Sequence, residues 1–221
     1  MARGRQPRDL ILNLGLESLN RDLPAEAASL LAAYVGLLAK WNRRVNLVSS
    51  TEDRILRPLL GEAVWAAGRY PTGSCSHLDI GSGAGFPALP FAILRPDVTF
   101  VLLEARARRA AFLETTAYEL GLRNVRVVAG RLDRYLRTLA TPGPWGCVSW
   151  KGIKLDRKEL SQLLSISSRD ARLWVFHGAD LPLDVQTVKE RLMLNWREPC
   201  PCHSGWFLSE YVPRLVSRET T

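Results

Sequence analysis

A glycine-rich loop between a short strand and a helix constrains this chain more than any other feature. The short apolar run at residues 76–80 predicts a strand, and a helix is predicted from Phe86 onward. The loop between them places glycine at every second position, as Gly81, Gly83 and Gly85. Because glycine lacks a Cβ, the backbone can turn tightly here and approach a ligand closely at the start of the helix. The spacing differs from the Gly-x-Gly-x-x-Gly of dinucleotide-binding folds.

Strands and helices alternate after this loop. Further strands are predicted at 98–103, 125–128, 145–150 and 171–176, with helices at 86–94, 106–120, 131–139 and 157–165. Such alternation implies right-handed crossovers and a parallel sheet that binds ligands at the carboxyl ends of its strands. Two final segments, 192–196 and 206–212, predict an antiparallel hairpin. The fold class is therefore α/β, with a mainly parallel sheet closed by a C-terminal hairpin.

The N-terminal part of the chain differs from the rest. Apolar residues recur at helical spacing from about residue 22 to 67, and Pro24 suits the start of a helix. Turn-forming residues at 70–74 separate this part from the first strand. We expect a helical element at 1–70 that grips the substrate and a second domain at 71–221.

Acidic residues accompany the glycine loop. Asp79 lies two residues before Gly81, where a carboxylate can orient a ligand's ammonium or amide groups, although a solvated Asp beside a structural turn is the alternative. Glu104 ends the second strand, where a carboxylate can accept hydrogen bonds from both ribose hydroxyls of an adenosine. Leu132 and Asp133 follow the third strand, near the expected adenine edge. Asp133 could equally serve only to stabilise a helix N-terminus.

Composition excludes several classes of protein. The 221 residues, 47% of them hydrophobic, suffice for a sizeable core, and no apolar run reaches the length of a membrane span. The four cysteines do not have the spacing of a disulfide framework, and the first residues do not show the unbroken apolar stretch expected of a signal peptide. We expect a cytoplasmic protein without membrane contact. A net charge of +8 is compatible with a nucleic-acid partner.

Several segments resemble one family in order along the chain, the small-subunit ribosomal RNA methyltransferase G family, also called glucose-inhibited division protein B. The matching segments are Trp-Asn-x-x-x-Asn-Leu at 41–47, Asp-x-Gly-Ser-Gly-x-Gly-Phe-Pro at 79–87, Glu-Leu-Gly-Leu-Arg-Asn-Val at 119–125 and Gly-Arg at 130–131. The resemblance covers roughly residues 30 to 180.

This resemblance implies a class I, Rossmann-like methyltransferase that transfers a methyl group from S-adenosylmethionine to N7 of a guanine in 16S rRNA. The implied partner is 16S rRNA or the small ribosomal subunit. Together with the acidic residues above, it implies that cofactor contacts come from Asp79, Gly81, Gly83, Gly85, Phe86, Glu104, Leu132, Asp133 and Trp150. Arg131 and Lys151 are the candidate catalytic residues, beside which guanine would enter.

The reaction itself fits the residues. Guanine N7 has an in-plane lone pair and needs no deprotonation, so holding the nucleophile in line with the methyl group can supply most of the catalysis. The Asp-Pro-Pro-Tyr type of tetrapeptide used by amino-group methyltransferases is replaced by residues 149–152, Ser-Trp-Lys-Gly. Cys147 lies inside a predicted strand, and we interpret it as a core residue and not as a nucleophile.

Departures from the family pattern gather on the acceptor side. The family's Ser-Arg-Ala reads Ser-Trp-Lys at 149–151, so an expected arginine is replaced by Trp150. Lys151 could supply the charge after a one-residue shift, and Trp150 could stack on a base. The family's His-[Phe/Leu]-x-Asp-Ser-Leu reads Pro-Leu-Leu-Gly-Glu-Ala at 58–63, so Pro58 and Gly61 depart from it. Val48 and His177 are further departures.

Basic side chains could hold RNA around this site. The candidates are Arg43, Arg44, Arg106, Arg108, Arg109, Arg131, Lys151 and Lys154, although a solvated helix face explains such runs as well. Trp41, at helical spacing, is interpreted as core. The segment Cys200-Pro201-Cys202-His203 offers too few ligands for zinc, so we expect a plain hairpin loop and no metal.

Two other functions remain open from the sequence. A degenerate relative could bind cofactor or RNA without transferring methyl groups, and the departures at Trp150 and Pro58 favour that alternative. A methyltransferase of the same build could also act on another RNA or on a small molecule.

Overall fold

The computed structural model describes residues 23–70, 76–138 and 145–214. The rest of the predicted 1–70 element and most of the predicted turn at 70–74 lie outside these residues. The helices are α2 (Ala25–Asn42), α3 (Asp53–Ala67), α4 (Ala88–Leu94), α5 (Ala107–Glu119), α6 (Leu132–Thr138), α7 (Arg157–Ile166) and α8 (Val185–Arg191). The strands are β1 (Ser76–Ile80), β2 (Thr99–Glu104), β3 (Val125–Ala129), β4 (Trp145–Lys151), β5 (Ser167–His177), β6 (Leu192–Pro199) and β7 (Phe207–Pro213).

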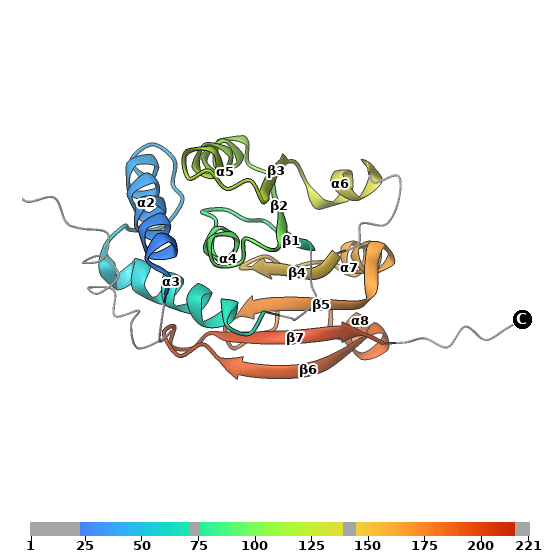
Figure 1. The fold of residues 1–221 in the computed structure, drawn as a ribbon. Helices are drawn as coiled ribbons and strands as arrows, with labels where there is room; N and C mark the ends of the chain where they lie inside the picture. Colours follow the sequence, from blue (N-terminus) through green and yellow to red (C-terminus); the bar gives the residue numbers. More distant parts are fainter. Residues whose placement is uncertain (1–22, 71–75, 139–144, 215–221) are drawn as a thin grey trace, which may run out of the picture.

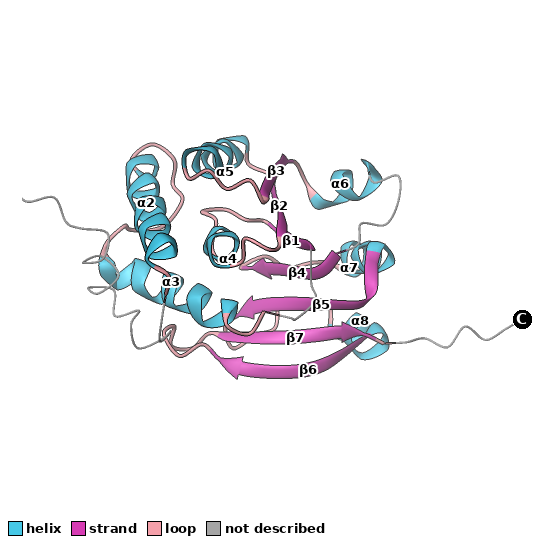
Figure 2. Ribbon diagram, in the orientation of Figure 1, coloured by secondary structure: helices cyan, strands magenta, loops and turns pink. Residues whose placement is uncertain are grey.

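A single seven-stranded sheet runs through the molecule in the order β3-β2-β1-β4-β5-β7-β6. The five strands from β3 to β5 are parallel, whereas β7 pairs antiparallel with both β5 and β6 (Figure 1). Figure 2 shows the C-terminal hairpin at one edge, with β6 outermost. The predicted α/β fold, with a mainly parallel sheet and an antiparallel hairpin, is therefore confirmed.

Alternating strand residues divide the core between the two faces of the sheet. On one face, Phe100, Leu102 and Trp174 pack with apolar residues of α2, α3, α4 and α5. On the other, Val101 and Leu103 pack with residues of α6 and α7. Because β2 is buried on both faces, its apolar residues form an unbroken run, as parallel central strands require.

Two elements differ from the sequence prediction. Helix α8 was not predicted, because its seven residues are mostly polar and carry no helical apolar stripe. Strand β5 begins at Ser167, earlier than predicted, because polar residues before Ala171 continue its pairing beside β4. Neither difference moves the carboxyl ends of the parallel strands, where a ligand is expected.

Candidate active site

A pocket of about 410 Å³ lies at the carboxyl ends of the parallel strands. It is bordered by Gly81 after β1, Glu104 at the end of β2, residues 130–132 after β3, and residues 151–155 after β4. Its volume falls in the range usual for sites that bind small molecules and cofactors. The predicted residues Gly81, Glu104, Arg131, Leu132 and Lys151 therefore come together around one cavity.

The glycine loop forms one wall of this pocket through its backbone. Gly81, Gly83 and Gly85 have φ angles of 72°, 55° and 91°, which residues with a Cβ rarely adopt. A Cβ on Gly85 would lie 2.5 Å from Cδ1 of Leu89, so any side chain at this position would also force the buried Leu89 to move. The backbone N–H groups of Gly81 and Ser82 both donate to the Leu103 carbonyl, which ties the loop to β2. Gly83 and Gly85 shape the loop without lining the pocket.

Glu104 is held rigidly beside this loop. One carboxylate oxygen accepts a hydrogen bond from the N–H of Gly83 and the other from the N–H of Arg106, each at 2.8 Å. The side chain is buried yet borders the pocket. Since each carboxylate oxygen can accept more than one hydrogen bond, Glu104 retains acceptor capacity for two adjacent hydroxyls of a ligand. This arrangement suits the predicted contact with a ribose.

Asp79 belongs to a buried hydrogen-bonded chain beneath the pocket. Ser149 donates to the Asp79 carboxylate at 2.5 Å, and the Ser149 hydroxyl lies 2.7 Å from Nε2 of His77. The hydroxyl of Tyr70 lies 2.7 Å from Nδ1 of the same ring. When Ser149 donates to Asp79, Nε2 of His77 must carry the proton and Tyr70 must donate to Nδ1.

Burial shifts the acidity of two members of this chain. It raises the pKa of Asp79 to about 7, against the opposing effect of hydrogen bonds from Ser149 and Ser82. It lowers the pKa of His77 to about 3, so the imidazole is neutral. Asp79 does not border the pocket. Its predicted direct contact with a cofactor therefore remains a proposal, and the contacts seen connect it to the β1–β4 core.

The remaining predicted cofactor residues, Phe86, Asp133 and Trp150, do not border the pocket. Phe86 is buried and contacts the ring of Tyr34 edge-on, with centroids 5.2 Å apart. Asp133, at the start of α6, pairs with Arg137 at 3.2 Å. Because this Asp is in the first turn, the helix-stabilising alternative is compatible with its position.

Trp150 and Lys151 lie on opposite faces of the sheet. Trp150 is fully buried among residues of the α6 and α7 face, so it presents no ring face on which a base could stack. The stacking alternative is therefore wrong for this structure. Lys151 instead points to the face covered by α3, where its ammonium pairs with Glu62. A one-residue shift along a strand reverses the face, so Lys151 does not place its charge where a side chain at position 150 would.

Three side chains that the sequence analysis did not select surround Lys151. Glu62 of α3 pairs with Lys151 through one carboxylate oxygen, and its other oxygen lies 2.9 Å from Nδ1 of His203. Trp206 lies with its ring 4.8 Å from the Lys151 ammonium nitrogen. The only sequence signal was the departure at 58–63, which includes Glu62. The cysteine-containing segment next to His203 is the loop between β6 and β7, as predicted.

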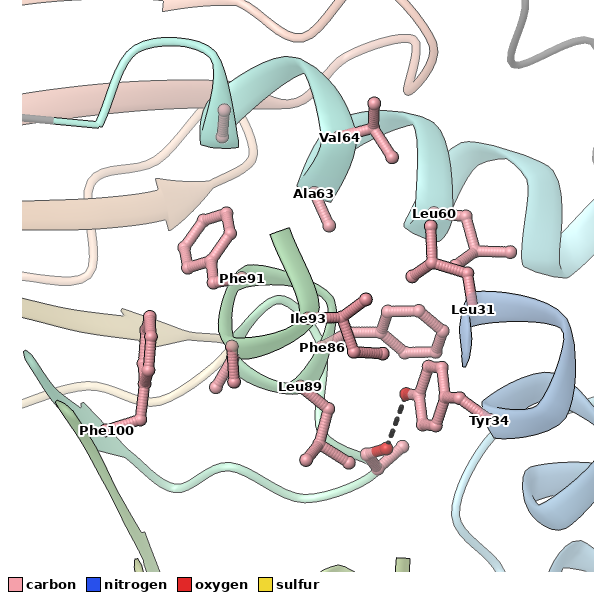
Figure 3. Packing of buried hydrophobic residues seen from close by; sticks show 14 of the residues in the cluster. Leu31, Tyr34, Leu60, Ala63, Val64, Phe86, Leu89, Phe91, Ile93 and Phe100 are labelled. Carbon is pink, nitrogen blue, oxygen red and sulfur yellow. Dashed lines mark hydrogen bonds between the residues drawn. The ribbon is translucent and has the colours of Figure 1, made fainter. Parts of the chain in front are cut away.

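Helix α2 supports the glycine loop directly. The hydroxyl of Tyr34 donates to the carbonyl of Ala84 at 2.8 Å, which Figure 3 shows as a dashed line beside Phe86 and Leu89. Farther along, the side chain of Asn42 binds the backbone of Leu47 and Val48 and so shapes the turn after α2. The N-terminal helices and the sheet thus share one hydrophobic core.

The other residues singled out in the sequence lie either in the core or on the surface. Cys147 is fully buried, which confirms it as a core residue. Trp41 contacts Phe112 edge-on at 5.8 Å and packs against the core, as predicted. His177 is buried, with Nε2 2.9 Å from the Ser209 hydroxyl. Of the candidate RNA-binding cations, Arg43, Arg44, Arg106, Arg108, Arg131 and Lys154 are exposed.

In residues 23–70, 76–138 and 145–214, no helix is long and apolar enough to cross a membrane. Within the same ranges, no group of His, Cys, Asp and Glu side chains is arranged to hold a metal ion.

Comparison with known proteins connects this geometry to a family. The model of the family described as rRNA small subunit methyltransferase G matches residues 27–141. A ribosomal RNA small subunit methyltransferase G of Neisseria gonorrhoeae is 42% identical over 124 residues, which are 55% of this chain and 59% of that relative. The chain thus spans about three-fifths of the length of that relative.

Solved structures share the fold. Cofactor-bound Rv0187 from MTB has a TM-score of 0.63 and 21% identity, and covers 95% of this chain and 98% of its own. The O-methyltransferase TomG from Streptomyces achromogenes, in complex with SAM, has a TM-score of 0.56 and 18% identity, with coverage of 95% and 99%. These similarities establish a class I methyltransferase fold. The match to the family model ends before β4, so it leaves out Trp150, Lys151 and the C-terminal hairpin.

Proposed function

Because the chain belongs to the rRNA small subunit methyltransferase G family, we propose that it transfers a methyl group from S-adenosylmethionine to N7 of a guanine in 16S rRNA. The observation that carries this proposal is the pocket bordered by both Gly81 and Glu104, at the carboxyl ends of β1 and β2. The same position in the sheet holds ligands in open α/β folds generally.

The residues of the pocket fit this cofactor. Glu104 would accept hydrogen bonds from the two ribose hydroxyls, using the acceptor capacity left after its bonds to Gly83 and Arg106. Leu132 and the backbone at 130–132 would border the adenine, with Asp133 beside it. The glycine loop would allow the close approach that a Cβ would prevent. When bound, S-adenosylmethionine supplies a methyl group activated by its sulfonium.

The protein's task in the reaction is to position the acceptor. Guanine N7 needs no general base, so the chain has to hold the base in line with the methyl group and exclude water. Lys151, at the end of β4 and at the edge of the pocket, would contact the base. Arg131 is exposed at the opposite rim and would contact the RNA backbone.

The RNA would be held by the basic surface around the pocket. Arg106 and Arg109, at the start of α5, line the pocket, and the exposed arginines at the end of α2, within the helical element at 1–70, would extend this grip. Such contacts bind phosphate independently of base sequence. We place the protein in the cytoplasm, with 16S rRNA or the small ribosomal subunit as its partner.

A second function is favoured by one observation: the position of the expected arginine is held by the fully buried Trp150, while the neighbouring charge, Lys151, is paired with Glu62. It is compatible with a methyltransferase of the same build that acts on another RNA or on a small molecule. A relative that binds cofactor without transfer is the third alternative.

Two measurements separate these functions. Calorimetric titration with S-adenosylmethionine tests the premise that they share, and a folded protein that binds none would contradict all of them. Cleavage by borohydride and aniline at N7-methylguanine, in 16S rRNA from wild-type and deletion cells, then tests the proposed reaction. One cleavage site lost in the deletion strain is expected, whereas an unchanged pattern would favour another acceptor or no transfer.

A further inference from the structure

A group of charged and aromatic side chains, one of them fully buried and the others partly buried, lies next to the pocket, on the face of the sheet covered by α3. We call Glu62, Lys151, His203 and Trp206 the Glu62 cluster. Glu62 pairs with Lys151 through one carboxylate oxygen and with Nδ1 of His203 through the other, at 2.9 Å. His203 stacks on Trp206, with ring centroids 4.9 Å apart and planes 17° from parallel. The cluster therefore joins helix α3, the end of β4 and the β6–β7 loop.

Burying the charges of this cluster destabilises the folded state unless they are paired. Glu62 is 0% exposed and the Lys151 side chain only 13% exposed. Removing a carboxylate from water costs several kcal/mol, which is about as much as the attraction of a well-placed positive partner regains. Well-packed apolar residues at the same positions would therefore give a fold of similar stability. Stability alone therefore does not account for a buried charge pair that borders the pocket.

The position of Lys151 suits it to contact a ligand. An ammonium has three N–H donors, of which Glu62 takes at least one, while the Trp206 ring covers one side of the nitrogen at 4.8 Å. Lys151 also borders the pocket beside Gly152 and Ile153. A remaining N–H donor can therefore be offered to an oxygen of the acceptor.

The carboxylate of Glu62 favours one kind of oxygen as the acceptor of the Lys151 hydrogen bond. Glu62 neutralises the ammonium and would repel a phosphate brought to the same place. A neutral carbonyl oxygen suffers no such repulsion and accepts a hydrogen bond from a charged donor well. In guanine, the carbonyl oxygen O6 and the nucleophile N7 are neighbouring acceptors on one edge of the base.

From these contacts we infer that Glu62 is a positioning residue for the methyl acceptor, acting through Lys151. It holds the Lys151 ammonium against Trp206, and Lys151 donates a hydrogen bond to the base carbonyl next to the nucleophilic nitrogen. This inference rests on the proposed function, since it assumes that the acceptor is a purine base.

Charge balance gives Glu62 a second effect. The N7 lone pair forms the new N–C bond as the S–C bond breaks, its electron pair stays on sulfur, and the positive charge passes to the purine. An unpaired ammonium beside that purine would oppose the transfer. Because Glu62 is paired with Lys151, the cluster does not oppose the charge that develops.

The test is a cycle of three variants assayed for methyl transfer to small ribosomal subunits from a deletion strain: Glu62→Gln, Lys151→Met and both together. We expect Lys151→Met to lower kcat/KM about 10- to 100-fold, as for loss of a hydrogen bond from a charged donor. The double variant should match Lys151→Met to within about threefold, because Glu62 acts only through Lys151. Affinity for S-adenosylmethionine should stay within about twofold in every variant that folds.

A matched control removes another ion pair that links the end of α3 to the hairpin. Arg69 and Glu198 pair at 2.8 Å on the surface, away from the pocket, so Glu198→Gln should leave transfer unchanged. Glu62→Gln alone should lower kcat/KM about 10-fold, because the Lys151 ammonium loses the carboxylate that holds it, and a folded Glu62→Gln protein with wild-type activity would overturn the inference. If Glu62→Gln does not fold, Glu62→Asp takes its place, because it keeps the carboxylate but shortens its reach to Lys151. A double variant clearly less active than Lys151→Met would overturn the inference.

Salt dependence distinguishes the base carbonyl from a phosphate. The measurement is the slope of the logarithm of the association constant for RNA against the logarithm of the salt concentration. If Lys151 contacts the base, Lys151→Met leaves this slope unchanged, whereas loss of a phosphate contact reduces its magnitude by about one. A reduced slope would overturn the assignment to the base. Failure of the wild-type protein to methylate any RNA would instead overturn the proposed function, and the inference with it.

Discussion

The donor side and the acceptor side of the pocket are built by different means. On the donor side, the glycine loop and Glu104 are held by backbone groups, through φ angles and N–H donors. On the acceptor side, Lys151 is held by side chains from α3 and the β6–β7 loop. The family model matches residues 27–141, which include the glycine loop, Glu104 and helix α3, whereas Lys151 and the β6–β7 loop lie beyond the matched range.

This difference explains which half can change. A backbone turn with positive φ tolerates little besides glycine, so its sequence is constrained locally. A charge pair between distant segments can be replaced if both partners change together, because removing one partner leaves a buried charge uncompensated. The donor side can therefore remain recognisable while the acceptor side is rebuilt.

The largest effect should come from Gly85→Ala. The new Cβ would lie 2.5 Å from Leu89, and φ of 91° is unfavourable for alanine. We expect unfolding free energy to fall by about 2–4 kcal/mol and cofactor affinity by more than about 100-fold, as strain and overpacking combine. Denaturant unfolding and calorimetry measure both.

Gly121→Ala is the control for Gly85→Ala. Its φ is also positive, at 65°, but a Cβ there would meet nothing within 4 Å. It should cost only about 1 kcal/mol and leave cofactor affinity unchanged. Equal losses of affinity in the two variants would show that strain, and not the shape of the loop, controls binding.

Glu104→Gln should have the next largest effect. The amide offers only one acceptor oxygen, so the N–H of Gly83 or of Arg106 would face an N–H group in place of a carboxylate oxygen. Affinity for S-adenosylmethionine should fall about 10- to 100-fold with RNA affinity unchanged. Glu159→Gln is the control, because Glu159 is also a carboxylate of the pocket but caps helix α7. It should change the affinity for S-adenosylmethionine less than about threefold. A fall in RNA affinity with Glu104→Gln would mean that the two sides are not separable.

Asp79→Asn should change how stability depends on pH. Burial raises the pKa of Asp79 to about 7, so the folded state favours the protonated carboxyl. The stability that the protonated Asp79 carboxyl contributes is fully present below the ordinary pKa of an aspartate, and it is lost as pH rises through about 7. The Asn variant should gain stability relative to wild type between pH 4 and 8, measured by denaturant unfolding. His77 is present in both proteins, so its titration cancels, and a difference independent of pH would contradict the prediction.

The smallest effect should come from Tyr34→Phe. This change removes the hydrogen bond from α2 to the Ala84 carbonyl and leaves that buried carbonyl with one partner fewer. We expect stability to fall by about 1 kcal/mol and cofactor affinity by about two- to fivefold. Tyr118→Phe, at a side chain 85% exposed, should change neither. If Tyr34→Phe leaves the cofactor affinity intact, α2 supports the fold without shaping the donor side.

The same contrast explains what could be predicted from the sequence. Most strands and helices followed from apolar periodicity, and Gly81 and Glu104 followed from a local motif and the strand that carries each. The contact of Glu62 with Lys151 joins residues far apart in the chain, and no local pattern indicates it. The opposite orientations of Trp150 and Lys151 could have been read from strand alternation, which places Ser149 and Lys151 on one face.

The central claim is that an intact donor side serves an acceptor side rebuilt around Lys151. The most direct test is to incubate the purified protein with labelled S-adenosylmethionine and small subunits from a deletion strain, and to map the label on 16S rRNA. We predict N7 methylation of one guanine, reduced by Lys151→Met without a matching loss of cofactor affinity. A folded protein that binds the cofactor and methylates that guanine equally well with Lys151→Met would contradict the account.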